Sequence, residues 1–189
     1  LVIEPDFRGT VGYGQAHFRA SFKQWGLTMQ DDVADALLWA VKQGHADPKR
    51  ACIAGASYGG YATLMGLVRH PELYRCGAAW VAVTDPRLMF EWSSRSDQSD
   101  EVRSYTYPRM IGDPVADAEQ LRDTAPVEQA ACAGIQIGTP RGSEGAPASL
   151  AVSAAGSGPE MPRQPRLKPC AGGTDQPEGR IVCAHGISP

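Results

Sequence analysis

A serine flanked by glycines lies between a short apolar run and a helical pattern, and this junction restricts the possible folds more than any other segment. Ala51 to Ala56 is an apolar run of a length typical of a buried strand. From Tyr58 to His70, apolar residues recur at helical spacing, and Pro71 follows directly. The pattern predicts a strand, a sharp turn at Ser57 and a helix.

Two further apolar runs and a second helical pattern surround this junction. Leu1 to Glu4 and Cys76 to Thr84 are predicted strands, and Asp31 to Gln43 is a predicted amphipathic helix that ends at Gly44. Strands that alternate with helices are typical of an α/β domain with a mostly parallel sheet. Right-handed crossovers then place the helices on the faces of that sheet.

The junction has the pattern G-x-S-x-G, followed by another glycine. Its residues are Gly55, Ala56, Ser57, Tyr58, Gly59 and Gly60. A serine at the tip of a sharp turn needs a strained backbone, and glycines on both sides keep the strand and the helix from colliding. Such a nucleophile elbow exposes the hydroxyl beside the free N–H groups of a helix start, and the N–H of Tyr58 would stabilise an oxyanion. The alternative is a flexible strand-to-helix turn without a catalytic role.

The composition changes near Ala131. All 14 aromatic residues lie at or before Tyr107, and 18 of the 58 residues from Cys132 to Pro189 are glycine or proline. We therefore expect an ordered domain over residues 1–131 and a low-complexity Gly/Pro/Ala-rich tail over residues 132–189, without regular secondary structure. A tail read out of frame and a natural, degenerate paralogue are the two hypotheses for this change.

Charge and cysteine content exclude several classes of protein. Lys and Arg total 18 against 21 Asp and Glu, so no basic field would attract nucleic acid or an anionic membrane. No apolar run is long enough for a transmembrane helix. Five cysteines, an odd number without a C-x-x-C pair, predict reduced thiols and no zinc site. A cytoplasmic location is expected, with a signal peptide in the parent protein as the alternative. Neither a metal nor a cofactor is expected.

Titratable residues outside the junction are expected to have structural roles. Carboxylates in the first turns of the predicted helix that begins at Asp31 favour the positive end of its dipole. Asp85 lies at the end of a predicted strand, from which it could approach the serine, but a cap or loop role is expected. Histidines that precede the tail are expected at the surface or at helix ends. The carboxylates are Asp31, Asp32 and Asp35, and the histidines are His17, His45 and His70.

Several segments together resemble the prolyl oligopeptidase family of serine peptidases. Gly55 to Ala62 is similar to the family's G-x-S-Y-G-G-Y motif, which is far more restrictive than G-x-S-x-G. The other similar segments are Pro5 to Gly14, Trp25-Gly26, Asp31-Asp32, Asp47 to Arg50, Asp113-Pro114 and Ala125-Pro126. The resemblance covers residues 1 to about 131 and implies part of an α/β-hydrolase catalytic domain.

This resemblance implies hydrolysis of short peptides by acyl transfer. Ser57 would be the nucleophile, a histidine its general base, and a carboxylate would orient that histidine. In α/β-hydrolases both partners follow the serine. Asp175 and His185 stand in loops that imitate the partner loops, but only ten residues separate them. The chain is therefore expected to be an inactive or crippled fragment of a serine peptidase; an esterase or lipase of this fold and a non-catalytic pseudoenzyme fragment are the alternatives.

Overall fold

A five-stranded sheet with a parallel centre forms the core of the fold. The computed structural model describes residues 1–92, 99–130, 135–138, 149–154 and 180–183. In spatial order the strands are β3 (Ile135–Gly138), β4 (Ser149–Ala154), β2 (Cys76–Trp80), β1 (Ala51–Ala56) and β5 (Arg180–Cys183). β1 pairs in parallel with β2 and β5, whereas β4 pairs antiparallel with β2 and β3. The predicted strand before the serine is therefore a central strand.

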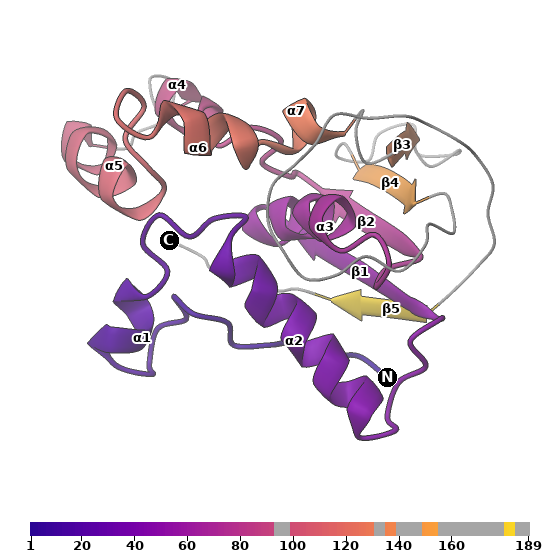
Figure 1. Ribbon diagram of the computed structural model, residues 1–189. Helices are drawn as coiled ribbons and strands as arrows, with labels where there is room; N and C mark the ends of the chain where they lie inside the picture. Colours follow the sequence, from indigo (N-terminus) through magenta and orange to yellow (C-terminus); the bar gives the residue numbers. More distant parts are fainter. Residues whose placement is uncertain (93–98, 131–134, 139–148, 155–179, 184–189) are drawn as a thin grey trace.

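Two long helices cover one face of this sheet. In Figure 1, α3 (Tyr58–Arg69) lies in front of β1 and β2, and α2 (Thr28–Lys42) runs below it; the two helices contact each other. Their apolar sides share one core with β1, and its fully buried side chains include Met29, Leu37, Ile53, Tyr61 and Leu67. Since α3 connects two adjacent parallel strands, β1, α3 and β2 form a βαβ unit.

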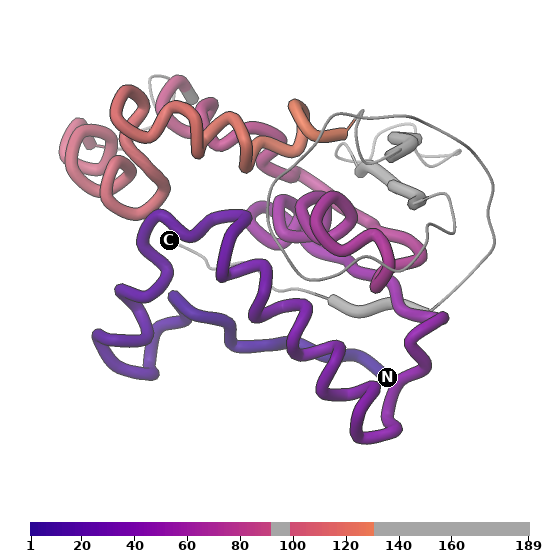
Figure 2. Tube along the Cα trace, viewed as in Figure 1, coloured from indigo at the N-terminus to yellow at the C-terminus, as the bar shows by residue number. Residues whose placement is uncertain are grey.

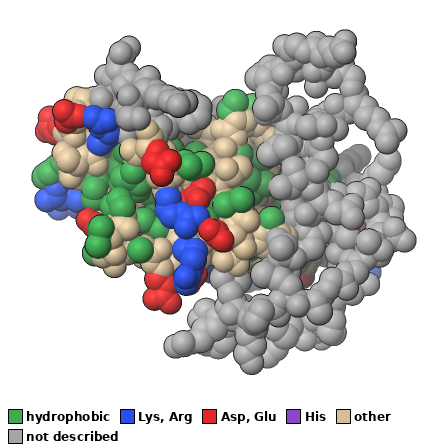
Figure 3. Space-filling model, turned by 90° about the horizontal axis from the view of Figure 1, so that it is seen from above, with side chains coloured by type: hydrophobic (Ala, Val, Ile, Leu, Met, Phe, Trp, Pro, Cys, Tyr) green, Lys and Arg blue, Asp and Glu red, His purple; other side chains and the backbone are tan. Residues whose placement is uncertain are grey.

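Short helices and loops complete the described part. These helices are α1 (Gln15–Arg19), α4 (Leu88–Trp92), α5 (Tyr107–Met110), α6 (Ala118–Asp123) and α7 (Pro126–Gln129), with a π-helical turn over Val102–Thr106. α4 to α7 lie together above α3 in Figure 1, and Figure 2 shows the first residues passing beside α2 on their way to α1. On the face seen in Figure 3, acidic and basic side chains lie close together.

The helix predictions were close, whereas one predicted strand is absent and another is shorter than expected. Leu1 to Glu4 has no strand pairing, since β2 and β5 already occupy both edges of β1, and the Leu1 side chain is exposed. The strand that begins at Cys76 ends at Trp80, four residues early, because Val81 has a positive φ of 45° that turns the chain out of the sheet. The helix expected from Asp31 begins three residues earlier, at Thr28.

The tail also contains regular structure, contrary to expectation. Three short strands lie within residues 132–189: β5 pairs with β1, β4 pairs with β2, and β3 pairs with β4. Strand pairing depends on hydrogen bonds between distant backbones, so a tail without periodicity can still supply it. The other residues of this tail lie outside the described residues, and the proposed boundary at residue 131 stays a prediction.

The prediction of reduced thiols is wrong for one pair of cysteines. Cys52 on β1 and Cys76 on β2 form a disulfide, with Cα atoms 4.7 Å apart. The parallel register places these two residues directly opposite each other. An odd number of cysteines and local spacing carry no information on such a contact between strands. The cytoplasmic location stays a prediction.

Removing this disulfide is expected to destabilise the fold by about 3 kcal/mol, because it closes a loop of 24 residues in the unfolded chain. The variant with both Cys52→Ala and Cys76→Ala should unfold at a lower urea concentration than the oxidised wild type. Peptide mapping without reductant should find the two cysteines in one linked pair of peptides. If mapping finds both as free thiols in the folded protein, the pairing is wrong.

The described residues do not indicate a membrane span or a metal centre. No helix in the described ranges is both long and apolar enough to cross a bilayer. Within the same ranges, no group of three or more His, Cys, Asp or Glu side chains converges in a way that could hold a metal ion.

Candidate active site

Ser57 occupies the turn between β1 and α3, at the carboxyl end of a central parallel strand. Its φ of 54° and ψ of −118° define a strained conformation that costs a non-glycine residue about 1 to 3 kcal/mol. Its N–H donates to the Trp80 carbonyl at 3.1 Å, which joins the turn to the end of β2. The residue itself is exposed. The turn therefore has the strained backbone and the accessible serine of a nucleophile elbow.

The glycine after the motif allows α3 to approach β2 closely. A Cβ atom on Gly60 would lie 2.7 Å from Ala82 Cβ and 2.9 Å from Ala82 Cα. Contacts this short require the backbone to move, so a side chain at position 60 has no room. Gly55 is a buried residue of β1, paired with Ala79 on β2, and the Gly59 carbonyl accepts a hydrogen bond within α3. For these two glycines the steric role stays a prediction.

Tyr58 follows the serine and begins α3. The first N–H groups of a helix have no partner within the helix, and they lie at its positive end. The Tyr58 N–H therefore suits the developing negative charge of an oxyanion. The Tyr58 side chain points the other way, into the core, where it is 5% exposed and its hydroxyl contacts Met29 Sδ at 3.6 Å. Burial raises the pKa of this phenol well above its ordinary value.

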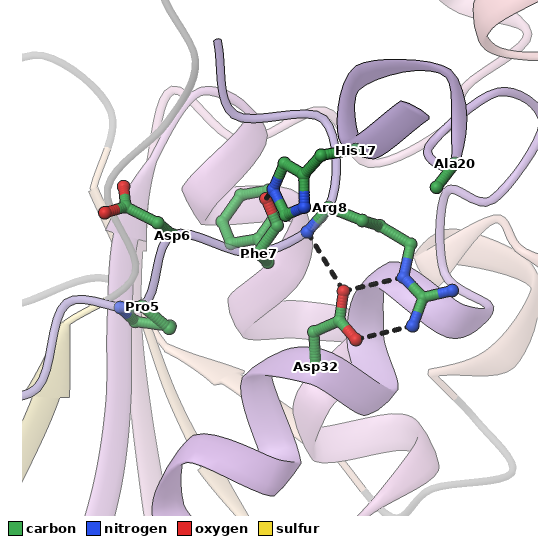
Figure 4. A pocket seen from close by; sticks show the side chains of 7 residues that line it. All are labelled: Pro5, Asp6, Phe7, Arg8, His17, Ala20 and Asp32. Atoms are coloured by element: carbon green, nitrogen blue, oxygen red, sulfur yellow. Dashed lines mark hydrogen bonds and ion pairs between the residues drawn. The ribbon is translucent and has the colours of Figure 1, made fainter. Parts of the chain in front are cut away.

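The segment before α1 packs against the elbow from one side. The Phe7 ring lies 5.5 Å from the Tyr58 ring, centroid to centroid. Asp32 of α2 holds this segment, because its carboxylate accepts hydrogen bonds from the backbone N–H, Nε and Nη2 of Arg8 at 3.0, 2.7 and 2.6 Å. Figure 4 shows this pair beside a pocket of about 460 Å³ that Phe7 and His17 also line.

Asp32 therefore does more than stabilise a helix dipole. Its burial alone would raise its pKa, but the hydrogen bonds and charge of Arg8 outweigh that effect and lower the pKa below the ordinary value. A carboxyl group with a lowered folded-state pKa stabilises the fold above its unfolded pKa, which is about 3.9. This contribution disappears as the pH falls through the folded-state pKa.

Asp32→Asn is accordingly expected to destabilise the fold by about 1 to 3 kcal/mol at pH 6, because charge-assisted hydrogen bonds to Arg8 are lost. The difference from the wild type should shrink at pH 3, because the carboxyl group is then largely protonated in the unfolded chain, and keeping it ionised in the folded protein costs free energy. Urea unfolding of the two proteins at both pH values measures this, and other carboxyl groups cancel in the comparison. A difference that stays constant between pH 6 and pH 3 would contradict the role of the Asp32 charge.

The described histidines contact groups other than the serine hydroxyl. His17 Nε2 lies 3.1 Å from the Phe7 carbonyl, and exposed His45 lies against the Trp39 ring. His70 caps the far end of α3, about 20 Å from Ser57 at 1.5 Å per helical residue. Within the described part of the chain, the Ser57 side chain has no hydrogen-bond or ion-pair partner. Asp175 and His185 lie outside the described residues.

Asp85 has a structural role in the loop after β2. Its carboxylate is bound by the Arg87 side chain at 2.6 to 2.9 Å and by the Arg87 N–H at 2.9 Å. Burial would raise the pKa of Asp85, but the hydrogen bonds from Arg87 lower it below its ordinary value. Arg87 also reaches Glu128 of α7 at 2.6 Å. The pair thus joins this loop to α7, which agrees with the expected loop role.

Two contacts around the elbow could not be found from sequence pattern. Arg8 and Asp32 are 24 residues apart, and Trp25 lies 33 residues before Tyr58, whose ring it contacts edge-on at 4.7 Å. No local periodicity relates residues at such separations. The only available signal was that Arg8, Trp25 and Asp32 all lie in segments that resemble the family.

Comparisons with known proteins agree with this geometry. Residues 1–133 match the Prolyl oligopeptidase family. Dipeptidyl aminopeptidase BIII of Pseudoxanthomonas mexicana is 34% identical over 136 residues, which are 68% of this chain and 19% of the relative. Dipeptidyl peptidase family member 6 of Caenorhabditis elegans is 38% identical over 76 residues, 40% of this chain and 10% of the relative. The chain thus spans a fifth or less of the length of these curated relatives.

Solved structures show the same fold. A puromycin-hydrolyzing peptidase of Mycobacterium tuberculosis superposes with a TM-score of 0.58 at 25% identity, over 66% of this chain and 18% of that one. A puromycin hydrolase superposes with a TM-score of 0.57 at 27% identity, over the same shares of the two chains. The predicted partial α/β-hydrolase fold is therefore confirmed. With the family matched over residues 1–133, the chain belongs to the prolyl oligopeptidase family of serine peptidases.

Proposed function

We propose that the chain carries the nucleophile of a serine peptidase that cleaves short peptides by acyl transfer through Ser57. The conformation of Ser57 carries this proposal: an exposed serine is held in a strained turn at the start of a buried helix. Strain of this kind persists only where the surrounding structure maintains it, and it is concentrated at functional sites. The family and the peptidase names of the relatives support peptides as substrates.

In the proposed reaction, the Ser57 hydroxyl attacks the scissile carbonyl and forms a tetrahedral intermediate. The Tyr58 N–H donates to its oxyanion, and a histidine takes the serine proton and returns it to the leaving amine. Water then hydrolyses the acyl-enzyme. Asp175 and His185 stay the candidates for the two partners of Ser57. Without a well-placed base, oxyanion stabilisation and substrate binding still leave some acceleration, so slow turnover is expected.

Two chromogenic substrates test the substrate class. We expect the full chain to release p-nitroaniline slowly from dipeptidyl anilides, as well as p-nitrophenol from activated esters, and both rates should depend on Ser57. Cleavage of the ester alone, while anilides stay intact, would favour an esterase of the same fold. A folded chain that cleaves neither substrate faster than its Ser57→Ala variant would be a pseudoenzyme.

A further inference from the structure

The residue that supplies the oxyanion donor is also the residue that anchors the elbow in the core. The Tyr58 ring packs against three other rings: Trp25 at 4.7 Å, Phe7 at 5.5 Å and Tyr61 at 5.6 Å between centroids. We call these four residues the aromatic cluster. The backbone N–H and the ring of Tyr58 belong to one residue, so a displacement of the ring also moves the N–H.

Each neighbour of Tyr58 is held by contacts outside the elbow. Phe7 is 3% exposed, and the next residue is bound through its backbone and side chain to α2, as described above. Trp25 precedes Gly26, whose carbonyl accepts a hydrogen bond of 2.7 Å from Arg69 at the far end of α3. The Tyr61 hydroxyl donates to the Thr124 carbonyl at 2.9 Å. The ring positions are therefore set by the loops before α1 and α2 and by the end of α6.

Packing rather than polar bonding holds the Tyr58 ring. Among the described residues, its hydroxyl forms one weak hydrogen bond, with the sulfur of Met29 at 3.6 Å. The strained backbone of Ser57 immediately before it would relax if the ring were free to move. Trp25 meets this ring with an interplanar angle of 72°, an edge-on arrangement favoured between aromatic rings. The cluster is therefore placed to oppose that relaxation.

We propose that Phe7 and Trp25 are positioning residues that act through the Tyr58 ring to hold the Ser57 turn and the Tyr58 N–H in their reactive geometry. This inference rests on the proposed function of Ser57 for its kinetic consequence. The inference also has a structural consequence: the cluster keeps the Ser57 N–H bonded to the Trp80 carbonyl. This consequence does not depend on the proposed function.

The test compares Trp25→Leu with Trp25→Phe in the full chain. Leucine keeps an apolar side chain but removes the ring edge, whereas phenylalanine restores a ring. Trp39→Leu is the matched control, because Trp39 is 58% exposed on α2 and its ring contacts His45 rather than the elbow. Thermal unfolding gives the folded fraction of each variant, so that every rate is expressed per folded molecule.

The kinetic measurement is phosphonylation of Ser57 by a fluorophosphonate probe, with the maximal rate constant separated from the probe's binding constant. Trp25→Leu should lower the maximal rate constant about tenfold, since small misplacements of reactive groups cost up to about 100-fold. Binding of the probe should change little. Trp25→Phe should recover most of the loss, and Phe7→Leu should reproduce it.

Hydrogen exchange supplies a second measurement that needs no reactivity. The protection of the Ser57 N–H should fall about tenfold in Trp25→Leu, because local opening then costs less free energy than global unfolding. The protection of β1 should be unchanged. If Trp25→Leu lowers the protection of the Ser57 N–H while the wild-type chain does not react with the probe, the result would support the role of the cluster and refute the proposed function. If the wild-type chain is labelled but Trp25→Leu behaves like Trp39→Leu in both measurements, the positioning role of the cluster is refuted and the proposed function is not.

Discussion

Replacing Ser57 with alanine is expected to lower the cleavage of anilides and esters by about a thousandfold or more, down to the residual rate that substrate binding and oxyanion stabilisation still provide. Alanine has no hydroxyl to form the acyl-enzyme, while its Cβ tolerates the same backbone as that of serine. The loss should therefore appear in turnover and not in thermal stability. Initial rates with saturating p-nitrophenyl ester measure it.

Ser57→Gly is the matched control for the backbone. Glycine adopts a positive φ without strain, so this variant should also lose activity but gain about 1 kcal/mol in the free energy of unfolding. Equal stability of the glycine and alanine variants would mean that the turn is not strained. Retained hydrolysis in both variants would assign the activity to another residue.

Gly60→Ala is expected to destabilise the fold by about 2 kcal/mol or more, because the added methyl group overlaps the backbone of Ala82. That backbone cannot move aside as the end of a side chain can, so α3 would have to shift away from β2. The Trp80 carbonyl, which accepts the Ser57 N–H, lies 3.2 Å from the same Cβ position. Urea unfolding should show the loss of stability, and phosphonylation of Ser57 should slow at the same time.

Gly66→Ala provides the comparison within the same helix. Its added Cβ would meet the side-chain ends of Ile53 and Gln30 at 3.0 and 3.1 Å, which can give way. Alanine also has the higher helix propensity, by about 1 kcal/mol. The Gly66 variant should therefore lie within about 1 kcal/mol of the wild type. If the two glycine variants are equally stable, the close approach of α3 to β2 does not depend on Gly60.

The elbow could be predicted from sequence because all its determinants are local. A buried strand, a turn with glycines and an amphipathic helix follow one another within 20 residues, and each has its own pattern of apolar residues. The positive φ of Ser57 follows from the same pattern, since a sharp turn from a strand into a helix requires a strained backbone conformation at its tip. The bounds of α2 and α3 differ from the expected ones by at most three residues.

Features that join distant segments could not be predicted in this way. Leu1 to Glu4 is as apolar as a strand but lacks a partner, and the partner of β1 is instead β5, more than 120 residues later in the chain. The Cys52–Cys76 disulfide depends on the register between β1 and β2. Such contacts are decided by three-dimensional packing, and a single sequence contains no periodic signal for them.

The most direct test of the proposed nucleophile is the intact mass of the purified chain after reaction with a fluorophosphonate. We predict one phosphonyl adduct per chain, located at Ser57 by peptide mapping and absent from Ser57→Ala. Such a result requires a serine whose hydroxyl is activated and whose oxyanion is stabilised. A folded wild-type chain without an adduct, or with an adduct on another residue, would contradict the assignment of Ser57 as the nucleophile.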